Sequence, residues 1–176
     1  ESVGAQDPPV IIWVADKGVR DSQFGYFDGT ASHLLGPSYE GRDIEGLACL
    51  HDIVYASSGR DGLGPSSLYT LAVDLAGNNA TLNKIGDIQT AAQEAIFEVV
   101  GLSSKADGSL WGYADKAPLR GIIRLDPLTA VAELVAPSDL KIEGIAWIGD
   151  TLWLAGDNHL YRWTGSGAIT LAYTID

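Results

Sequence analysis

The stretch Ile44-Glu45-Gly46-Leu47-Ala48 recurs almost unchanged as Ile142-Glu143-Gly144-Ile145-Ala146 near the end of the chain. Weaker copies of the same motif are Val99-Val100-Gly101-Leu102 and Ser2-Val3-Gly4-Ala5. The glycines of the four copies are 42, 55 and 43 residues apart. Repetition at a nearly constant spacing is typical of a fold in which one structural unit is repeated and each copy packs against the next.

Three further segments follow each glycine in the same order. An aromatic residue comes 9 or 10 positions later, inside an apolar segment: these residues are Trp13, Tyr55, Trp111 and Trp153. A third segment reads Phe24–Asp28, Tyr69–Asp74, Ile122–Asp126 and Leu160–Thr164. The fourth is Ala31–Leu35, Ala80–Ile88, Ala130–Val135 and Ala168–Ile175. Because β-branched and aromatic residues dominate these segments, and Asp-Gly, Gly-Asn and Ser-Gly pairs mark the turns, each unit is predicted to form four short strands.

Four strands in a unit of about 40 to 50 residues are typical of a β-propeller blade. The sequence therefore predicts an all-β fold, a single propeller domain over residues 1–176, with blades at approximately 1–40, 41–94, 95–138 and 139–176. Each blade is expected to contain four antiparallel strands, and insertions at 59–67 and 88–95 account for the longer second unit. Residues 90–94 could form one helical turn at most. An alternative is that the four blades form half of a larger ring that another chain completes.

The composition of the 176 residues agrees with a turn-rich β fold. There are 16 Asp and 21 Gly against 7 Glu, and Asp and Gly favour turns whereas Glu favours helices. With 46% hydrophobic and 19% charged residues, the chain is not expected to be disordered. No apolar run reaches the roughly 18 residues that a membrane-spanning helix needs. The net charge of −12 argues against nucleic acid or an anionic membrane as the partner.

The chain contains no Met, including at position 1, and a single cysteine, Cys49. The missing initiator Met predicts that a signal peptide has been removed or that the chain is a fragment of a longer product. We therefore expect a secreted, periplasmic or cell-surface protein. One cysteine excludes an intrachain disulfide. Its apolar surroundings predict that Cys49 is buried, and the alternatives are a reactive thiol or an interchain bridge.

The order of the repeated segments resembles the blades of secreted six- and seven-bladed propellers. The motif Ile-Glu-Gly-(Leu/Ile)-Ala, a turn, an aromatic strand, then Leu-Tyr and an Asp is similar to blades of the esterase-like phytase and gluconolactonase-type families. The resemblance covers essentially the whole chain, at the level of the repeat. In gluconolactonase-type propellers a similar Glu-Gly start supplies a ligand to a divalent metal, which implies this role for Glu45 and Glu143. This chain has only four repeats, so an active site shared among six blades does not carry over intact.

Glu45 and Glu143 occupy equivalent positions on the predicted innermost strands of blades two and four, where blades one and three carry Val3 and Val100. In a closed ring of four blades the two carboxylates would face each other across the central channel. Two like charges at short distance are unfavourable unless a cation or protons lie between them. We expect either a divalent cation such as calcium in the channel, or hydrogen bonds from neighbouring backbone and water.

Acidic and basic residues recur in the predicted loops between the second and third strands. The acidic ones are Asp16, Asp61, Asp115 and Asp157, and the basic ones are Lys17, Arg20, Arg42, Arg60, Lys116 and Arg120. The Asp side chains could cap their own turns, or they could hold calcium or a cationic ligand at the channel mouth. The basic side chains could pair with them or bind an anionic group such as phosphate. The candidate binding residues are Asp16, Arg42, Asp61, Asp115 and Asp157, with a small molecule, a glycan or a protein as partner.

No set of residues in the sequence has the spacing of a known catalytic motif. His33, His51 and His159 do not form a metal-binding pair, and no nucleophile elbow or phosphate-binding loop is present. The repeated aromatic residues are expected to pack between blades, although a sugar-stacking ring is an alternative. The sequence therefore favours a binding or assembly module. The alternatives are a divalent-metal-dependent hydrolase of the lactonase or phytase-like type, and a structural subunit of an extracellular polymer.

Each predicted blade is complete in sequence order, so no strand exchange ties the two chain ends together. The ring must then close by packing of blade one against blade four, or it does not close within one chain. Open apolar faces at both ends would favour self-association.

Overall fold

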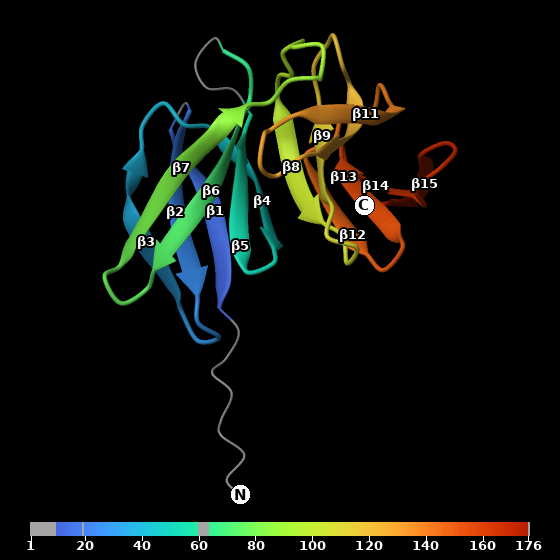
Figure 1. Cartoon of the computed structure of the whole chain (residues 1–176). Coiled ribbons are helices and arrows are strands. Elements are labelled where there is room, and N and C mark those ends of the chain that lie inside the picture. Colours follow the sequence, from blue (N-terminus) through green and yellow to red (C-terminus); the bar gives the residue numbers. More distant parts are fainter. Residues whose placement is uncertain (1–9, 19, 60–63, 176) are drawn as a thin grey trace, which may run out of the picture.

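The structure is a computed structural model that describes residues 10–18, 20–59 and 64–175. These residues form fifteen strands and no helix, which confirms the all-β prediction (Figure 1). The first sheet contains β1 (Ile11–Gly18), β2 (Asp21–Phe27) and β3 (Ser32–Tyr39). The second contains β4 (Ile44–Leu50), β5 (Ile53–Ser58), β6 (Ser67–Asp74) and β7 (Asn79–Asp87).

The third and fourth sheets follow the same plan. The third contains β8 (Val99–Ser104), β9 (Leu110–Ala114), β10 (Gly121–Leu125) and β11 (Ala132–Pro137). The fourth contains β12 (Gly144–Ile148), β13 (Thr151–Gly156), β14 (His159–Trp163) and β15 (Thr170–Thr174). In every sheet the strands are antiparallel and lie in sequence order. The predicted innermost strand of blade one, with Val3, lies outside the described residues.

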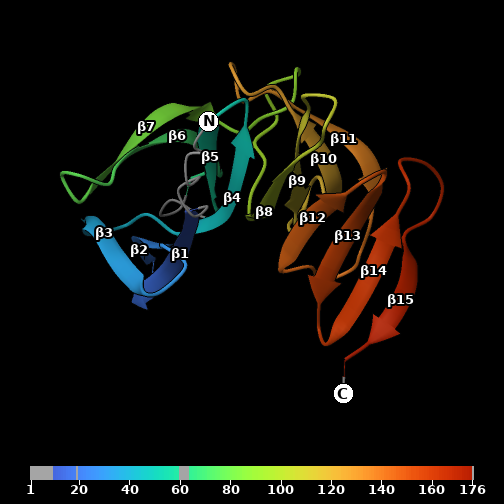
Figure 2. The same ribbon diagram turned by 90° about the horizontal axis from the view of Figure 1, so that it is seen from below.

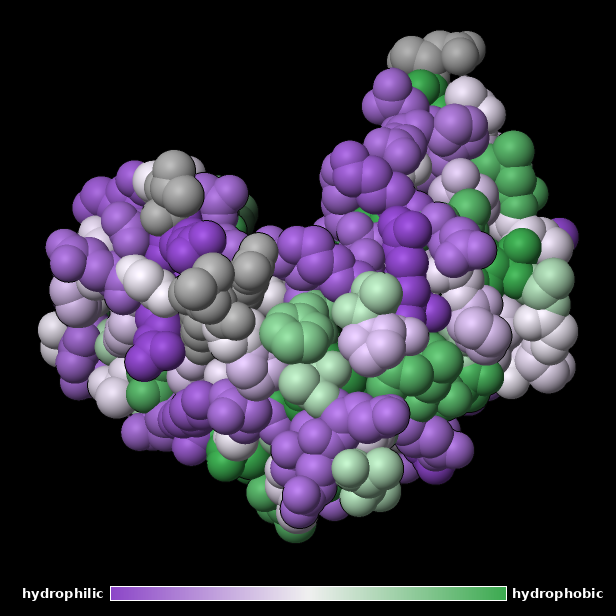
Figure 3. Space-filling model, turned by 90° about the horizontal axis from the view of Figure 1, so that it is seen from above, coloured by the Kyte–Doolittle hydropathy of each residue, from purple (hydrophilic) through white to green (hydrophobic). Residues whose placement is uncertain are grey.

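The four sheets are arranged around a common axis as the blades of a β-propeller. The inner strand β4 contacts β8, β8 contacts β12, and β1 contacts β4. Figure 2 shows the sheets following one another in an arc that is open between the first and the fourth. In Figure 3 this opening is a notch between the two arms of the molecule. The four-bladed propeller is confirmed, and its ring is not closed by packing of the first sheet on the fourth.

Three hydrophobic cores hold the blades together, each between two neighbouring sheets. Phe24, Leu35 and Tyr69 belong to the core between the first and second sheets. The second core joins the second and third sheets, and the third joins the third and fourth. The second and third sheets therefore bury side chains on both faces. This explains why the strands of these two sheets carry apolar residues at adjacent positions.

The insertion at 88–95 packs into the core between the second and third sheets. Ile88 and Ile96 are fully buried there. Residues 90–94 form a turn rather than a helix: the Thr90 hydroxyl accepts a hydrogen bond from the Glu94 amide (3.1 Å), and Gln93 has a φ of 64°. The prediction allowed at most one helical turn at residues 90–94, and the structure has a non-helical turn there.

The expectation that Cys49 is buried was wrong, because its thiol is exposed. Along β4 the residues Gly46, Ala48 and Leu50 are buried, and Cys49 lies between two of them on the other face. Successive side chains of a strand point to opposite faces, so the apolar surroundings in sequence did not make this position a core position.

Two of the four repeated aromatic residues lie in cores between blades, as expected. Tyr55 faces the third sheet and Trp111 faces the fourth. Trp153 points in the same direction, but no described sheet covers it, and its ring stacks on Tyr173 (centroids 6.4 Å apart, interplanar angle 17°). Trp13 lies on the opposite face, because Val14, which pairs with Phe24, is the residue that faces the second sheet.

Candidate functional site

The repeated motif forms an irregularity in strand pairing in the second and third sheets, whereas β12 pairs with β13 without a register shift. Ile44 pairs with Ser58 and Gly46 with Ser57, so Glu45 is an extra residue in the β4–β5 ladder. The β8–β9 register shifts at the equivalent position, between Val99 and Leu102. A β-bulge changes the direction of a side chain relative to the regular strand. The bulge in β4 accompanies the orientation of Glu45 toward the propeller axis, and Glu143 reaches the same place from the position before β12.

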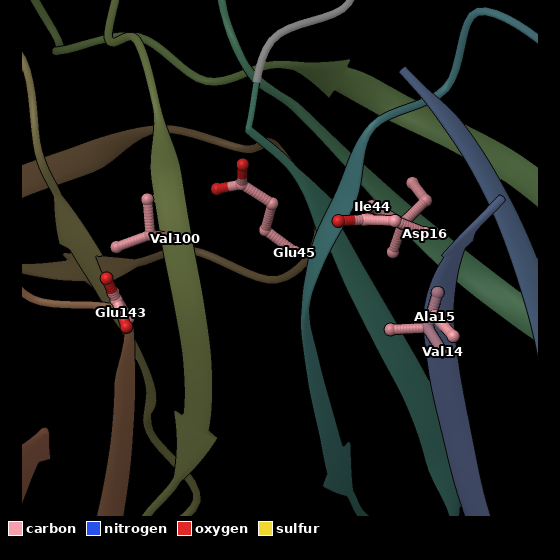
Figure 4. Close-up of a pocket in the computed structure, with 7 residues that line it drawn as sticks. All are labelled: Val14, Ala15, Asp16, Ile44, Glu45, Val100 and Glu143. Atoms are coloured by element: carbon pink, nitrogen blue, oxygen red, sulfur yellow. The ribbon is translucent and has the colours of Figure 1, made fainter. Parts of the chain in front are cut away.

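A pocket of about 400 Å³ lies at this axis and is lined by residues of all four blades (Figure 4). We call it the axial pocket, and it is lined by Val14, Ala15, Asp16, Ile44, Glu45, Val100 and Glu143. Figure 4 shows the carboxylates of Glu45 and Glu143 on the two sides of Val100. Glu143 lies directly before β12, where its amide donates to the Ala155 carbonyl (2.8 Å). Both predicted metal-ligand positions are thus brought to one pocket.

Glu45 is an ionisable group of the axial pocket whose pKa is strongly raised. Its Oε2 is buried without a hydrogen-bond partner, and its carboxyl group packs directly on Gly59, where any side chain would overlap it. The pKa of Glu45 is raised from 4.5 to about 7. Burial is the largest cause, and the negative charges of Asp43, Glu98 and other nearby acids add to it. The group is therefore close to half-protonated at neutral pH.

Cationic side chains neutralise two of the acids near Glu45 but do not line the axial pocket. Lys116 Nζ lies 2.5 Å from Glu98 Oε1. Arg120 donates to Asp115 Oδ1 through Nε (3.0 Å) and Nη2 (2.7 Å). The pocket itself is lined by three carboxylates and by no Lys or Arg side chain among the described residues. It is therefore a negatively charged site.

The five candidate binding residues do not form one cluster. Asp16 lines the axial pocket, whereas Asp115 is paired with Arg120 and is not among the lining residues. Arg42 donates to the Tyr69 hydroxyl (3.3 Å) and lies over the Tyr69 ring. Asp157 is 3.7 Å from Lys141 Nζ and lines a different pocket, which it shares with Glu143. Asp61 lies outside the described residues.

The site residues that sequence reasoning missed are those that surround Glu45. Asp43, Gly59 and Glu98 are brought together by backbone hydrogen bonds: the Gly59 amide donates to Asp43 (2.7 Å), and the Glu98 amide donates to Gly59 (2.8 Å). Glu98 comes from the third blade, so no local sequence pattern indicated this contact. The Gly59 that follows Ser57-Ser58 was a possible signal, because glycine permits close approach of another group.

The gluconolactonase-type resemblance implies a divalent metal at this place. The unpartnered Oε2 of Glu45 suits a cation, but calcium takes six to eight oxygen ligands. No group of three or more His, Cys, Asp and Glu side chains is arranged to hold a metal ion within residues 10–18, 20–59 and 64–175. The described side chains therefore do not make a complete metal site, and we derive no reaction step through a metal.

Comparison with known proteins supports the fold. The search found no matching family model and no matching curated protein. Among solved structures, the chain is similar to a candidate gluconolactonase (TM-score 0.55, 13% identity, 88% of this chain and 48% of that one). TolB from Acinetobacter baumannii is similar over 95% of this chain and 44% of its own (TM-score 0.53, 13% identity). A third is the extracellular domain of a candidate hybrid two-component system from B. thetaiotaomicron (TM-score 0.50, 14% identity, 93% and 22%).

These similarities establish that the chain has the fold of larger β-propellers, including one of the gluconolactonase type. The chain spans about half or less of the length of these three proteins. In the part of the chain that the structure describes, no helix has the length and hydropathy needed to cross a membrane.

Proposed function

We propose that this chain is a binding module that takes up a cation or a cationic group of a small ligand in the axial pocket. The observation that carries the proposal is the buried Oε2 of Glu45, which has no hydrogen-bond partner, in a pocket that Asp16 and Glu143 also line. An ionised carboxylate that has lost water needs an opposite charge or hydrogen-bond donors, and a cation in the pocket supplies the charge.

Calcium is the simplest candidate ligand. It accepts carboxylate oxygens in flexible geometry and keeps waters in its shell, so the side chains of Glu45 and Glu143 would supply part of the coordination and water the rest. A pocket of about 400 Å³ has room for a hydrated ion or a small organic cation. We place this binding outside the cytoplasm, which is supported by the resemblance to secreted propellers and the similarity to an extracellular domain.

A metal-dependent hydrolase of the lactonase or phytase-like type is the second candidate. The presence of Glu45 and Glu143, the two implied metal ligands, in one pocket favours it. Hydrolysis of a lactone and of a phosphate ester, measured with and without calcium, tests this candidate. Activity that is lost in the Glu45→Gln variant would support it, and absence of turnover in every condition would contradict it.

Isothermal titration calorimetry with calcium chloride tests the binding proposal. At pH 8, where Glu45 is ionised, we expect saturable binding, and at pH 5 we expect it to weaken because the carboxyl group is protonated. The Glu45→Gln variant should bind about tenfold more weakly or worse. Glu94→Gln, which changes an exposed carboxylate, is the matched control and should bind like the unmodified chain. Choline chloride serves as the organic cation.

Equal affinity of the unmodified chain and Glu45→Gln for both cations would contradict the proposal. The same conclusion would follow if neither calcium nor choline bound at pH 8.

A further inference from the structure

The inner strands of neighbouring blades approach each other at the glycine of the repeated motif. A Cβ atom at Gly46 would lie 2.8 Å from the backbone nitrogen of Leu102 in the third blade. A Cβ atom at Gly101 would lie 3.2 Å from the backbone nitrogen of Ile145 in the fourth blade. Both contacts involve the residue that directly follows the next motif glycine. The glycine therefore creates room for the inner strand of the next blade.

Gly144 is the same motif position in the fourth blade, and it has no such neighbour. A Cβ atom there would have no described atom within 4 Å. The backbone of Gly144 is also not in the left-handed region, so no turn requires glycine at this position. Among the described copies of the motif, Gly144 is the one beside which no inner strand of a following blade packs.

The outward face of the fourth sheet around Gly144 carries mostly apolar side chains, together with the exposed Arg162, which pairs with Trp153. We call it the fourth-sheet face and define it by Gly144, Ala146, Ile148, Trp153, Tyr173 and Ile175. Ile148, Tyr173 and Ile175 are 66%, 63% and 58% exposed. In the third sheet, Trp111 occupies the position equivalent to Trp153, and it is only 8% exposed because side chains of the fourth sheet cover it. The fourth-sheet face thus has the surface of a blade interface without the next blade.

The other end of the arc also presents an apolar face. The first-sheet face consists of Ile11, Trp13 and Leu34, which point away from the second sheet. Ile11 and Leu34 are 58% and 59% exposed. Figure 2 shows the first and the fourth sheet on the two sides of the opening, so within the described residues neither of these sheets packs on the other.

We propose that the fourth-sheet face binds the first-sheet face of a second copy of this chain, so that blade stacking continues from one copy to the next. The contact is head to tail, because a fourth blade always meets a first blade as each blade within the chain meets the following one. The four blades correspond to about half of the larger propellers that share the fold, 48% and 44% of their length. Two arcs therefore supply enough blades to close one ring, and a rotation that does not close would give a filament.

Sedimentation equilibrium of the unmodified chain at micromolar concentration is the first test. We expect a species of twice the mass of one chain, or a series of larger species if the copies form a filament. A single species with the mass of one chain at the highest soluble concentration would overturn the proposal.

Variants at the two faces test the contact itself. Gly144→Val fills the room for the incoming strand, and Leu34→Asp places a charge on the first-sheet face; both should be monomeric. Tyr173→Asp is a second variant of the fourth-sheet face in case Gly144→Val does not fold. Leu128→Asp is the matched control, because Leu128 is 81% exposed in the turn between β10 and β11 and should leave the mass unchanged.

Mixing the two monomeric variants distinguishes head-to-tail contact from a symmetric one. Gly144→Val keeps an intact first-sheet face and Leu34→Asp keeps an intact fourth-sheet face, so the mixture should form a two-chain species that neither variant forms alone. Dimers of Leu34→Asp alone would overturn the proposal, because they would show that two fourth-sheet faces pair with each other. Failure of the mixture to associate while the unmodified chain does associate would overturn it as well.

Discussion

Replacing Glu45 by Gln is expected to stabilise the folded chain at pH 8 and to have little effect at pH 5. Burial, followed by the charges of Asp43 and Glu98, raises the pKa of Glu45 from 4.5 to about 7. Between these two pH values the folded state keeps a proton that the unfolded state has released, so stability falls as the pH rises. One pH unit corresponds to about 1.4 kcal/mol, which gives a cost of roughly 3 kcal/mol above pH 7 as an upper value. Partial solvent screening reduces the expected gain to about 1–3 kcal/mol.

Urea unfolding followed by tryptophan fluorescence, with a chelator present, measures this effect at both pH values. Gln has nearly the size of Glu and carries no charge, so the variant should unfold at higher urea concentration than the unmodified chain at pH 8. At pH 5, close to the ordinary pKa of 4.5, most of this cost is absent and the difference between the two should be much smaller than at pH 8. The control Glu94→Gln should change little at either pH. A difference of the same size at pH 5 and pH 8, or a less stable Gln variant at pH 8, would refute the reasoning.

The remaining predictions concern the contacts between blades. Ser57→Ala removes a buried hydroxyl that donates a hydrogen bond to a β8 carbonyl of the third sheet (3.1 Å), and it should lower the free energy of unfolding in urea by about 1–2 kcal/mol. The control Ser32→Ala changes an exposed hydroxyl and should lower it by less than about 0.5 kcal/mol. Equal effects of the two substitutions would contradict a bridging role for Ser57. Leu154→Ala empties a fully buried position between the third and fourth sheets and should cost about 3 kcal/mol in the same assay. Gly46→Val should abolish folding, because a Cβ atom at Gly46 would lie 2.8 Å from the backbone nitrogen of Leu102 in the next blade. Gly144→Val should leave the circular dichroism spectrum unchanged, because no described atom lies within 4 Å of a Cβ atom there. Similar spectra for the two variants would show that the close approach of β4 and β8 does not require glycine.

The blade architecture could be predicted because its determinants are local in sequence. The repeated motif marks the start of the inner strands β4, β8 and β12, and short apolar segments bounded by turn residues, such as Leu110–Ala114, mark the other strands. Glu45 and Glu143 could be assigned to the axis for the same reason, since equivalent residues of repeats occupy equivalent places.

The environment of Glu45 could not be predicted, because it depends on pairing and on contacts between blades. The extra residue in the β4–β5 ladder becomes visible only when Ile44 is paired with Ser58 and Gly46 with Ser57. Glu98 reaches the site from a different blade, so its influence on the pKa of Glu45 has no signature near either residue.

Trp13 shows how a small offset can mislead an argument from repeats. Asp16 follows Trp13 by three residues, whereas Asp115 follows Trp111 by four. In a strand, a shift of one residue moves a side chain to the opposite face. Ile12 and Val14 therefore face the second sheet, and Trp13 points away from it.

The separation of the apolar interior into three cores, each between two neighbouring sheets, has a consequence for how the chain opens. Stability in such an arrangement is close to a sum of nearest-neighbour terms, as in solenoid repeats. The third sheet has a neighbour on both sides and the fourth on only one, so the amide protons of β14 and β15 should exchange with solvent sooner than those of β9 and β10. Unfolding would then begin at a free end of the arc and proceed blade by blade, and any contact that covers the ends would slow the exchange there first.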